Sequence, residues 1–199
     1  LARDERALAP EWGDDLVMVC RMEPHKRQHL AVEAMRHVRT PVRLRLCGQA
    51  GSPSYLATLQ EAVARHGLHG RVMVQHGWLD EDAKHRLLET ALAAVYLGVD
   101  EDSYGYPTLE AARACKATVV AEDGGGVREF VVDDESGIIA AADPIALAGC
   151  FDRLWSDRRE ARRLGEAARA RIDDMQISWE RVTEALITAA RGRETVAGP

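Results

Sequence analysis

Residues 93–121 read AAVYLGVDEDSYGYPTLEAARACKATVVA and contain one complete strand–helix–strand unit. The apolar runs Ala93–Leu97 and Thr118–Ala121 predict two buried strands. The segment 107–115 between them predicts a helix, because Pro107 suits the first helical position. Two strands joined through a helix pair in parallel with a right-handed crossover. The unit therefore predicts part of a parallel α/β sheet.

The same alternation extends over most of the chain. It favours a Rossmann-like parallel sheet of about six strands with helices on both faces and a C-terminal helical extension. Ligands of such sheets bind beyond the carboxyl ends of the strands, so candidate sites are expected directly after each apolar run. The other predicted strands are Leu16–Cys20, Val42–Cys47, Arg71–Gln75 and Gly137–Ala140, and the other predicted helices are 26–38, 53–66, 81–91, 127–132, 144–155, 158–172 and 178–190.

The bulk properties are those of one soluble domain. The 199 residues suffice for a single core, and we expect a linker over 1–15, the Rossmann-like domain over 16–190 and a flexible tail over 191–199. The net charge of −6 argues against a general nucleic-acid binder. No apolar stretch approaches the ~20 residues of a transmembrane segment. The four cysteines form no CxxC pair, which favours reduced thiols in a cytoplasmic protein.

The first candidate site follows the first predicted strand. Arg21 and Lys26 lie on the loop that leads into a helix, where free backbone N–H groups and the helix dipole favour anions. A diphosphate bound there would be held by both cations and these amides. From this segment alone, the alternative is a pair of solvated surface cations.

The second candidate site, residues 102–110, follows the fourth predicted strand. Gly105 allows the backbone to approach a ligand closely. Glu110 offers two acceptor oxygens that match a vicinal diol such as a ribose, and Asp102 can accept a hydrogen bond from a sugar hydroxyl. The alternative is that Glu110 only complements the helix dipole.

Glycines mark two further positions. Gly124, Gly125 and Gly126 follow the fifth predicted strand and can form either an anion-binding nest of backbone N–H groups or a plain turn. Gly48 follows the second strand in a Gly-Gln-Ala-Gly segment. This segment lacks the GxGxxG spacing, which counts against a dinucleotide-dependent dehydrogenase.

These segments, in this order, resemble glycosyltransferase family 4, the group 1 glycosyl transferases. The family pattern has a Gly-Arg-Leu…Lys loop, then an acidic residue, Gly-Phe-Gly and a second acid eight places on, then a Gly-Gly-x-x-Glu turn. The matching segments are Cys20–Lys26, Asp102–Glu110 and Gly125–Glu129, with Arg71–Trp78 similar to the strand that leads to a glycine at the nucleotide pocket and Ser178–Glu180 similar to the start of the C-terminal helix.

The resemblance implies the donor-binding domain of a retaining, metal-independent hexosyltransferase with the two-domain GT-B architecture. Arg21 and Lys26 would stabilise the leaving diphosphate of a UDP- or GDP-linked sugar, and Asp102 would contact the donor sugar. Glu110 would bind the ribose. No cofactor or metal is implied, because the cations take the metal's place. The other implied donor-binding residues are Gly48, Gly77, Trp78, Gly105, Tyr106, Pro107 and Thr108, with Gly125, Gly126 and Glu129 as secondary candidates.

The resemblance also implies a preceding N-terminal domain, which would hold a sugar, a lipid-linked or another small acceptor. We therefore expect this chain to bind donor but to transfer poorly by itself. The expected location is cytoplasmic, with peripheral attachment to the inner membrane face through the preceding domain as an option.

Two departures from the family pattern keep alternatives open. Asp102 is one methylene shorter than the usual Glu, and Cys20 is bulkier than the usual Gly. Either change would fit an unusual donor or reduced activity. The alternatives are a nucleotide-sugar epimerase or phosphorylase on the same architecture, and a non-catalytic nucleotide-sugar-binding domain.

Overall fold

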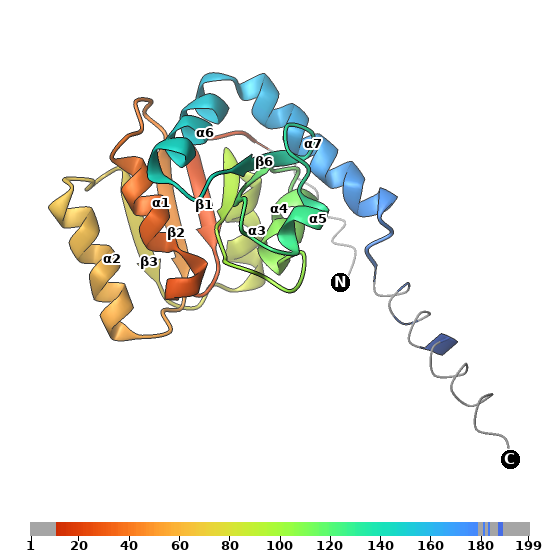
Figure 1. The fold of residues 1–199 in the computed structure, drawn as a ribbon, viewed down its shortest axis with the longest axis horizontal. Helices are drawn as coiled ribbons and strands as arrows, with labels where there is room; N and C mark the ends of the chain where they lie inside the picture. The colour runs from red at the N-terminus through yellow and green to blue at the C-terminus, as the bar shows by residue number, and fades with distance from the viewer. Residues whose placement is uncertain (1–10, 179–180, 182, 184–186, 189–199) are drawn as a thin grey trace, which may run out of the picture.

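The computed structural model describes residues 11–178, 181, 183, 187 and 188. Six strands form one parallel sheet in the order β3-β2-β1-β4-β5-β6 (Figure 1). This order and the parallel pairing confirm the predicted Rossmann-like fold class. The strands are β1 Asp15–Val19, β2 Arg43–Gly48, β3 Val72–His76, β4 Ala93–Tyr96, β5 Thr118–Ala121 and β6 Gly137–Ala140.

The strand bounds agree with the predicted ones to within one residue at each end. Strands β4 and β5 are buried along their whole length. A strand in a parallel sheet is covered by helices on both faces, so it reads as a short continuous apolar run. That property made the strands visible in the sequence.

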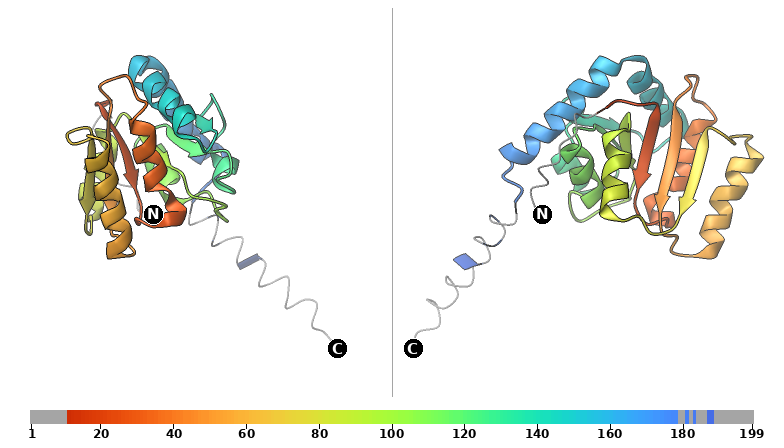
Figure 2. Two further views of the ribbon diagram at one scale, coloured as in Figure 1. Left: turned by 60° about the vertical axis from the view of Figure 1, so that its left-hand side comes forward. Right: turned by 180° about the vertical axis from the view of Figure 1, so that it is seen from behind.

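Helices cover both faces of the sheet (Figure 2). On one face, side chains of α1, α2 and α6 pack with alternate strand residues such as Leu16 and Met18. On the other face, α3 and α4 pack against Val17 and Ala94, and α5 and α7 complete this side near β5. The helices are α1 Gln28–Met35, α2 Pro53–Arg65, α3 Glu81–Glu89, α4 Tyr106–Arg113, α5 Val127–Phe130, α6 Pro144–Ser156 and α7 Arg158–Asp174.

The helix expected over 26–38 is divided in two. A 3-10 turn, η1, spans Pro24–Lys26, and α1 begins only after Arg27, whose φ of 59° is left-handed. A left-handed residue cannot continue a right-handed helix, so the chain changes direction there. Most of the helix expected over 178–190, and the expected tail over 191–199, lie outside the described residues, as do residues 1–10 of the expected linker. No helix in the described part is long and apolar enough to cross a membrane.

The segment that enters β1 is anchored at the amino edge of the sheet by a buried lysine. Lys116 precedes β5 and is fully buried. Its ammonium donates a hydrogen bond to the backbone oxygen of Glu11 and lies 4.2 Å from the centre of the Trp12 ring. Burial lowers the pKa of Lys116 to about 8. A buried ammonium held by a carbonyl and a ring therefore lies at this edge.

We expect Lys116→Met to change how stability depends on pH. The folded-state pKa of about 8 lies below the ordinary value of 10.5, so the unfolded chain binds more protons between these two pH values. The free energy of unfolding of the wild type therefore rises with pH across this window, by about 2–3 kcal/mol relative to that of the variant. Urea unfolding of both proteins at pH 7 and pH 10 measures the difference. A difference that is the same at both pH values would contradict this account.

Candidate functional site

The strand order places the expected site at the carboxyl ends of β1 and β4. The chain winds from β1 toward β3 on one side of the sheet and from β4 toward β6 on the other, so the order reverses between them. Connections leave opposite faces at such a switch point, and ligands of parallel sheets bind there, in the crevice between the loops that follow the two strands. We call this place beyond the carboxyl ends of β1 and β4 the crevice. The loop after β1 carries Arg21 and Lys26, and the segment after β4 leads through Asp102 to Glu110 on α4.

Backbone hydrogen bonds connect the loops after β1, β4 and β5 at this edge. The amide of Val99 donates to the carbonyl of His25 over 3.1 Å, and the amide of Gly126 donates to the carbonyl of Glu101 over 2.6 Å. Segments far apart in the sequence are thereby held together as one surface. The sequence-predicted sites after β1, β4 and β5 meet at this edge.

An ion pair between side chains reinforces the same junction. Both terminal nitrogens of Arg27 donate to the carboxylate of Asp123, each over 2.7 Å. The hydrogen bonds from Arg27 hold the pKa of Asp123 below its ordinary value. This bidentate geometry fixes orientation as well as distance. It accounts for the left-handed residue between η1 and α1, since that turn carries Arg27 toward the loop after β5.

Lys26 reaches across from η1 to the end of β4. Its Nζ donates to the hydroxyl of Tyr96 over 2.8 Å and to Oε1 of Glu101. The side chains of Lys26 and Glu101 are each only 14% exposed. Burial alone would lower the pKa of Lys26, but the hydrogen bonds to Glu101 and Tyr96 outweigh it, and the pKa is raised. Lys26 is therefore a protonated, partly buried cation at the carboxyl ends of β1 and β4.

Arg21 is placed differently from Lys26. Its side chain is 70% exposed and forms an ion pair with Glu23 over 2.8 Å. Its backbone carbonyl is fixed from below, because it accepts a 2.8 Å hydrogen bond from the buried side chain of Gln28. The backbone at Arg21 is thus held while the guanidinium remains open to solvent.

The cysteine that departs from the family pattern packs toward α1. The Sγ of Cys20 accepts a hydrogen bond from Gln28 over 3.2 Å. Burial raises the pKa of this thiol to about 12, so it stays protonated and is not a nucleophile. The backbone of Cys20 lies against Gly48, where a Cβ would come within 2.2 Å of the Cys20 carbonyl oxygen. Gly48 therefore permits the close approach of the loop after β1.

Glu110 has a cationic partner that the sequence did not reveal. Lys84 on α3 donates to its Oε1 over 2.6 Å, and both side chains are partly buried. Burial alone would lower the pKa of Lys84, but its hydrogen bonds to Glu110 and Glu81 raise it. Residues 84 and 110 lie on different helices, so no linear spacing could have indicated the pair. The carboxylate of Glu110 is thereby fixed against α3. An acid that only complemented the dipole of α4 would not need this partner.

The acid that contacts Lys26 is Glu101, whereas Asp102 beside it is exposed. Sequence reasoning selected Asp102 and did not consider Glu101. The two residues are neighbours with the same charge, and only the path of the loop decides which one turns toward Lys26. The eight-residue spacing to Glu110 singles out Asp102, and it carries no information on which acid turns toward Lys26.

Two of the candidate residues at the start of α4, Gly105 and Thr108, have roles in packing and hydrogen bonding within the fold. Gly105 has a φ of 72°, and a Cβ there would lie 2.8 Å from the Tyr96 ring. The buried hydroxyl of Thr108 donates to the carbonyls of Tyr104 and Gly105. This hydroxyl is therefore occupied within the helix start. Pro107 lies in the first turn, and the Tyr106 side chain is exposed.

The glycine segment after β5 is required by packing. Gly125 has a φ of 66°, and a Cβ there would lie 2.5 Å from the carbonyl oxygen of Glu101. A Cβ at Gly126 would meet the same segment at 3.0–3.1 Å. These glycines allow the loops after β4 and β5 to touch, while Glu129 is exposed on α5. The contact between the two loops therefore explains why glycine stands at these positions, with no ligand needed.

Gly77 and Trp78 follow β3 on the same edge of the sheet. The Gly77 amide donates to the carbonyl of Gly48 over 3.2 Å, and its φ is 140°. The Trp78 side chain is 84% exposed. The exposed indole is an apolar surface with a polar N–H at this edge of the sheet.

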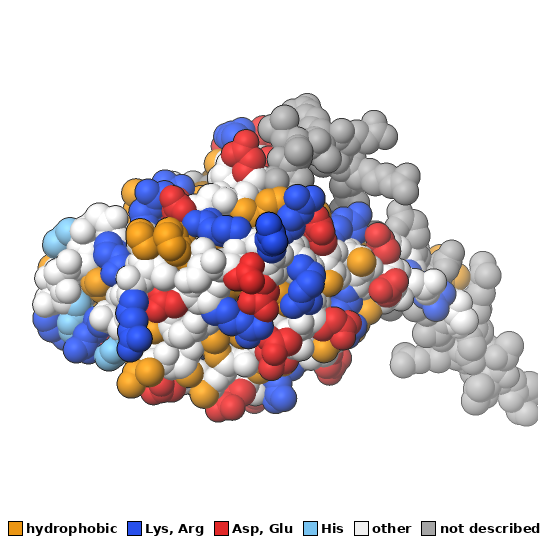
Figure 3. Space-filling view, turned by 90° about the horizontal axis from the view of Figure 1, so that it is seen from above, with side chains coloured by type: hydrophobic (Ala, Val, Ile, Leu, Met, Phe, Trp, Pro, Cys, Tyr) orange, Lys and Arg blue, Asp and Glu red, His pale blue; other side chains and the backbone are white. Residues whose placement is uncertain are grey.

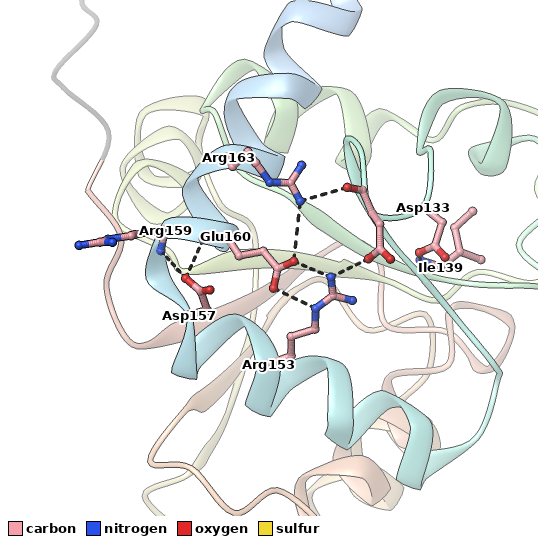
Figure 4. Close-up of polar contacts among 8 residues, drawn as sticks. Asp133, Ile139, Arg153, Asp157, Arg159, Glu160 and Arg163 are labelled. Carbon is pink, nitrogen blue, oxygen red and sulfur yellow. Dashed lines mark hydrogen bonds and ion pairs between the residues drawn. The ribbon is translucent and has the colours of Figure 1, made fainter.

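A separate charged cluster lies where α6 meets α7 (Figure 4). Arg153 donates to Glu160 over 2.9 Å and forms an ion pair with Asp134 over 2.7 Å, and these partners raise its pKa. Opposite charges are therefore matched within the cluster, which links both helices to the loop before β6. On the face viewed in Figure 3, Lys and Arg side chains are likewise interspersed with Asp and Glu. This cluster is structural. Among the described residues, no three His, Cys, Asp or Glu side chains are grouped as metal ligands.

Comparison with known proteins identifies relatives of this chain in sequence and in fold. The family model described as "Glycosyl transferases group 1" matches residues 4–171. A D-inositol 3-phosphate glycosyltransferase of Xylanimonas cellulosilytica is 31% identical, with 92% of this chain and 43% of the relative covered. A GDP-mannose-dependent alpha-(1-6)-phosphatidylinositol monomannoside mannosyltransferase of Mycolicibacterium smegmatis is 30% identical, with 79% and 43% covered. The chain thus spans less than half the length of these relatives.

Solved structures show the same fold. A sucrose-phosphate synthase from Thermosynechococcus elongatus superposes with a TM-score of 0.82 at 21% identity, covering 93% of this chain and 46% of that one. Anabaena HepE in complex with UDP superposes with a TM-score of 0.77 at 22% identity, covering 88% and 49%. At this level of identity, the likeness is one of fold.

We expect Gly48→Ala to be much more destabilising than Gly77→Ala. The two glycines have similar φ values, 144° and 140°, but a Cβ at position 48 would collide with the Cys20 carbonyl, whereas at position 77 it meets no described atom within 4 Å. The control Gly77→Ala should cost about 1–2 kcal/mol from backbone strain alone, and Gly48→Ala a further ~2 kcal/mol or more. Urea unfolding measures both costs. Equal losses would show that the loop after β1 does not press on position 48.

Proposed function

Since the chain belongs to the group 1 glycosyl transferases, we propose that it is the donor-binding domain of a retaining glycosyltransferase. The enzyme would move a hexose from a nucleotide diphosphate sugar to an acceptor. The observation that carries this proposal is the enclosed, protonated Lys26 at the crevice between β1 and β4. A permanent positive charge at a switch point is suited to the diphosphate of such a donor.

Lys26 and Arg21 are proposed to stabilise the leaving nucleoside diphosphate. Negative charge develops on the diphosphate as the bond from the sugar C1 breaks, and a cation already in place needs no reorganisation at that moment. The raised pKa of Lys26 keeps it charged, and the exposed Arg21 guanidinium would exchange its ion pair with Glu23 for an arriving anion. With both charges supplied by side chains, we propose a metal-independent reaction without a cofactor.

Glu110 is proposed to bind the ribose hydroxyls, and Asp102 to contact the donor sugar. Lys84 holds Oε1 of Glu110, so the carboxylate is oriented before the ligand arrives. Oriented acceptors lose little entropy on binding a diol. The remaining proposed donor contacts are Gly48, Gly77, Trp78, Gly105, Tyr106, Pro107 and Thr108, with Gly125, Gly126 and Glu129 as secondary contacts.

The donor nucleotide is proposed to be UDP or GDP. Anabaena HepE was solved with UDP, and the mycobacterial relative depends on GDP-mannose. The Xylanimonas relative is named for an inositol phosphate and the mycobacterial relative for a phosphatidylinositol mannoside, so we propose a polyol, sugar or lipid-linked acceptor. An N-terminal domain would hold that acceptor at the cytoplasmic face of the membrane. By itself, this chain would bind donor and transfer poorly.

We expect Glu110→Ala to weaken the binding of UDP or GDP at least tenfold, because the ribose loses its acceptor oxygens. Lys84 keeps its hydrogen bond to Glu81 in this variant, so no unpaired cation is left behind. Isothermal titration calorimetry of the 199-residue chain measures the change. Glu61→Ala, an exposed acid on α2, is the matched control and should bind as the wild type does.

Two results would contradict the proposal. One is that the wild-type chain binds neither nucleotide at millimolar concentration. The other is that Glu110→Ala binds nucleotide as tightly as the control does. In either case the acid on α4 would not belong to a nucleotide site.

A further inference from the structure

Glu101 is hydrogen-bonded to Lys26, and the loop after β4 holds Glu101 in the position that this contact needs. Its carbonyl accepts from the amide of Gly126 over 2.6 Å, and its amide donates to the carbonyl of Gly124 over 3.2 Å, so its backbone is fixed. Its carboxylate lies over Gly98, where a Cβ would come within 2.2 Å of Oε1. The pair is therefore built into the loop after β4 and differs from a chance pairing of surface charges.

Lys26 has few donors left for a ligand. A lysine ammonium has three N–H donors, and Glu101 and Tyr96 use two of them. Tyr96 is a neutral partner, since burial raises the pKa of its hydroxyl. Glu101 is an anion, and it competes directly with any anion that approaches Lys26. A diphosphate at Lys26 would either lie beside this carboxylate, at an electrostatic cost, or replace it.

We propose that Glu101 is the counter-ion that a donor diphosphate displaces from Lys26, and that this exchange sets the affinity for the nucleotide. This inference rests on the proposed function. In the free protein, Glu101 keeps the half-enclosed Lys26 charged and aimed at the crevice. In the complex, the diphosphate takes its place, and Tyr96 retains its hydrogen bond. When the nucleoside diphosphate leaves, Glu101 returns to Lys26 and favours release over tight retention of the product.

Glu101→Gln tests the exchange, because the amide oxygen can still accept from Lys26 while the negative charge is removed. We expect UDP or GDP to bind about tenfold more tightly to this variant, mostly through slower dissociation. Removing the charge also leaves burial as the larger influence on the pKa of Lys26, which should fall. The affinity of the variant should therefore begin to decrease at a lower alkaline pH than that of the wild type.

Asp100→Asn is the matched control, since it removes the same charge from an exposed position on the same loop. Its positive φ of 47° is one that Asn tolerates. Its affinity should stay within twofold of the wild type. Calorimetry and stopped-flow dissociation of UDP and GDP from the three proteins provide the comparison.

The outcomes separate the two proposals. If the wild type binds nucleotide and Glu101→Gln binds equally or more weakly, the counter-ion role is wrong and the donor site stands. If neither protein binds, the donor site itself is wrong. A crystal structure of the wild-type chain with UDP decides the matter independently of whether the variant folds. The proposal requires the diphosphate on Lys26 and Glu101 beyond hydrogen-bonding distance, and an intact Lys26–Glu101 hydrogen bond beside a bound diphosphate would overturn it.

Discussion

The hydrogen bonds from Lys26 to Glu101 and Tyr96 connect the two halves of the sheet at the place where its winding reverses. The connections after β1 and β4 leave opposite faces of the sheet at this point, and side-chain contacts add to the backbone hydrogen bonds that join their loops. A cation from the β1 side meets an anion and a phenol from the β4 side. Burying that cation would be costly without these partners, and their presence keeps it charged. The same contact therefore serves the fold and prepares a site for an anion.

Lys26 and Lys116 show how strongly the hydrogen-bond partner of a partly or fully buried lysine decides the direction of its pKa shift. Lys26 is paired with a carboxylate, and its pKa is raised. Lys116, at the opposite edge, donates to a backbone carbonyl and lies over an indole, and burial lowers its pKa to about 8. The contacts of Lys26 keep a positive charge at the carboxyl ends of β1 and β4. The contacts of Lys116 fix the segment that enters β1, although burying this ammonium lowers the stability.

The sequence was a good guide to the fold because the strands of a parallel sheet are apolar over their whole length. It also indicated the loops that meet at the crevice, since they follow those strands directly. It did not indicate Glu101 or Lys84, because both matter through side chains on other elements. It selected Asp102 by its eight-residue spacing to Glu110, and that spacing carries no information on the contact between Glu101 and Lys26. It did not show that the Thr108 hydroxyl is used within its own helix, or that Arg27 divides the first helix.

The central claim is that one crevice, between β1 and β4, receives the diphosphate. Chemical-shift mapping of the backbone amides during a titration with UDP and GDP tests it most directly. We expect the largest shifts in residues 20–27, 97–110 and 123–127, which form the three connected loops and the start of α4. Shifts centred on the α6–α7 cluster around Arg153 and Glu160, with the loops after β1 and β4 unchanged, would contradict it.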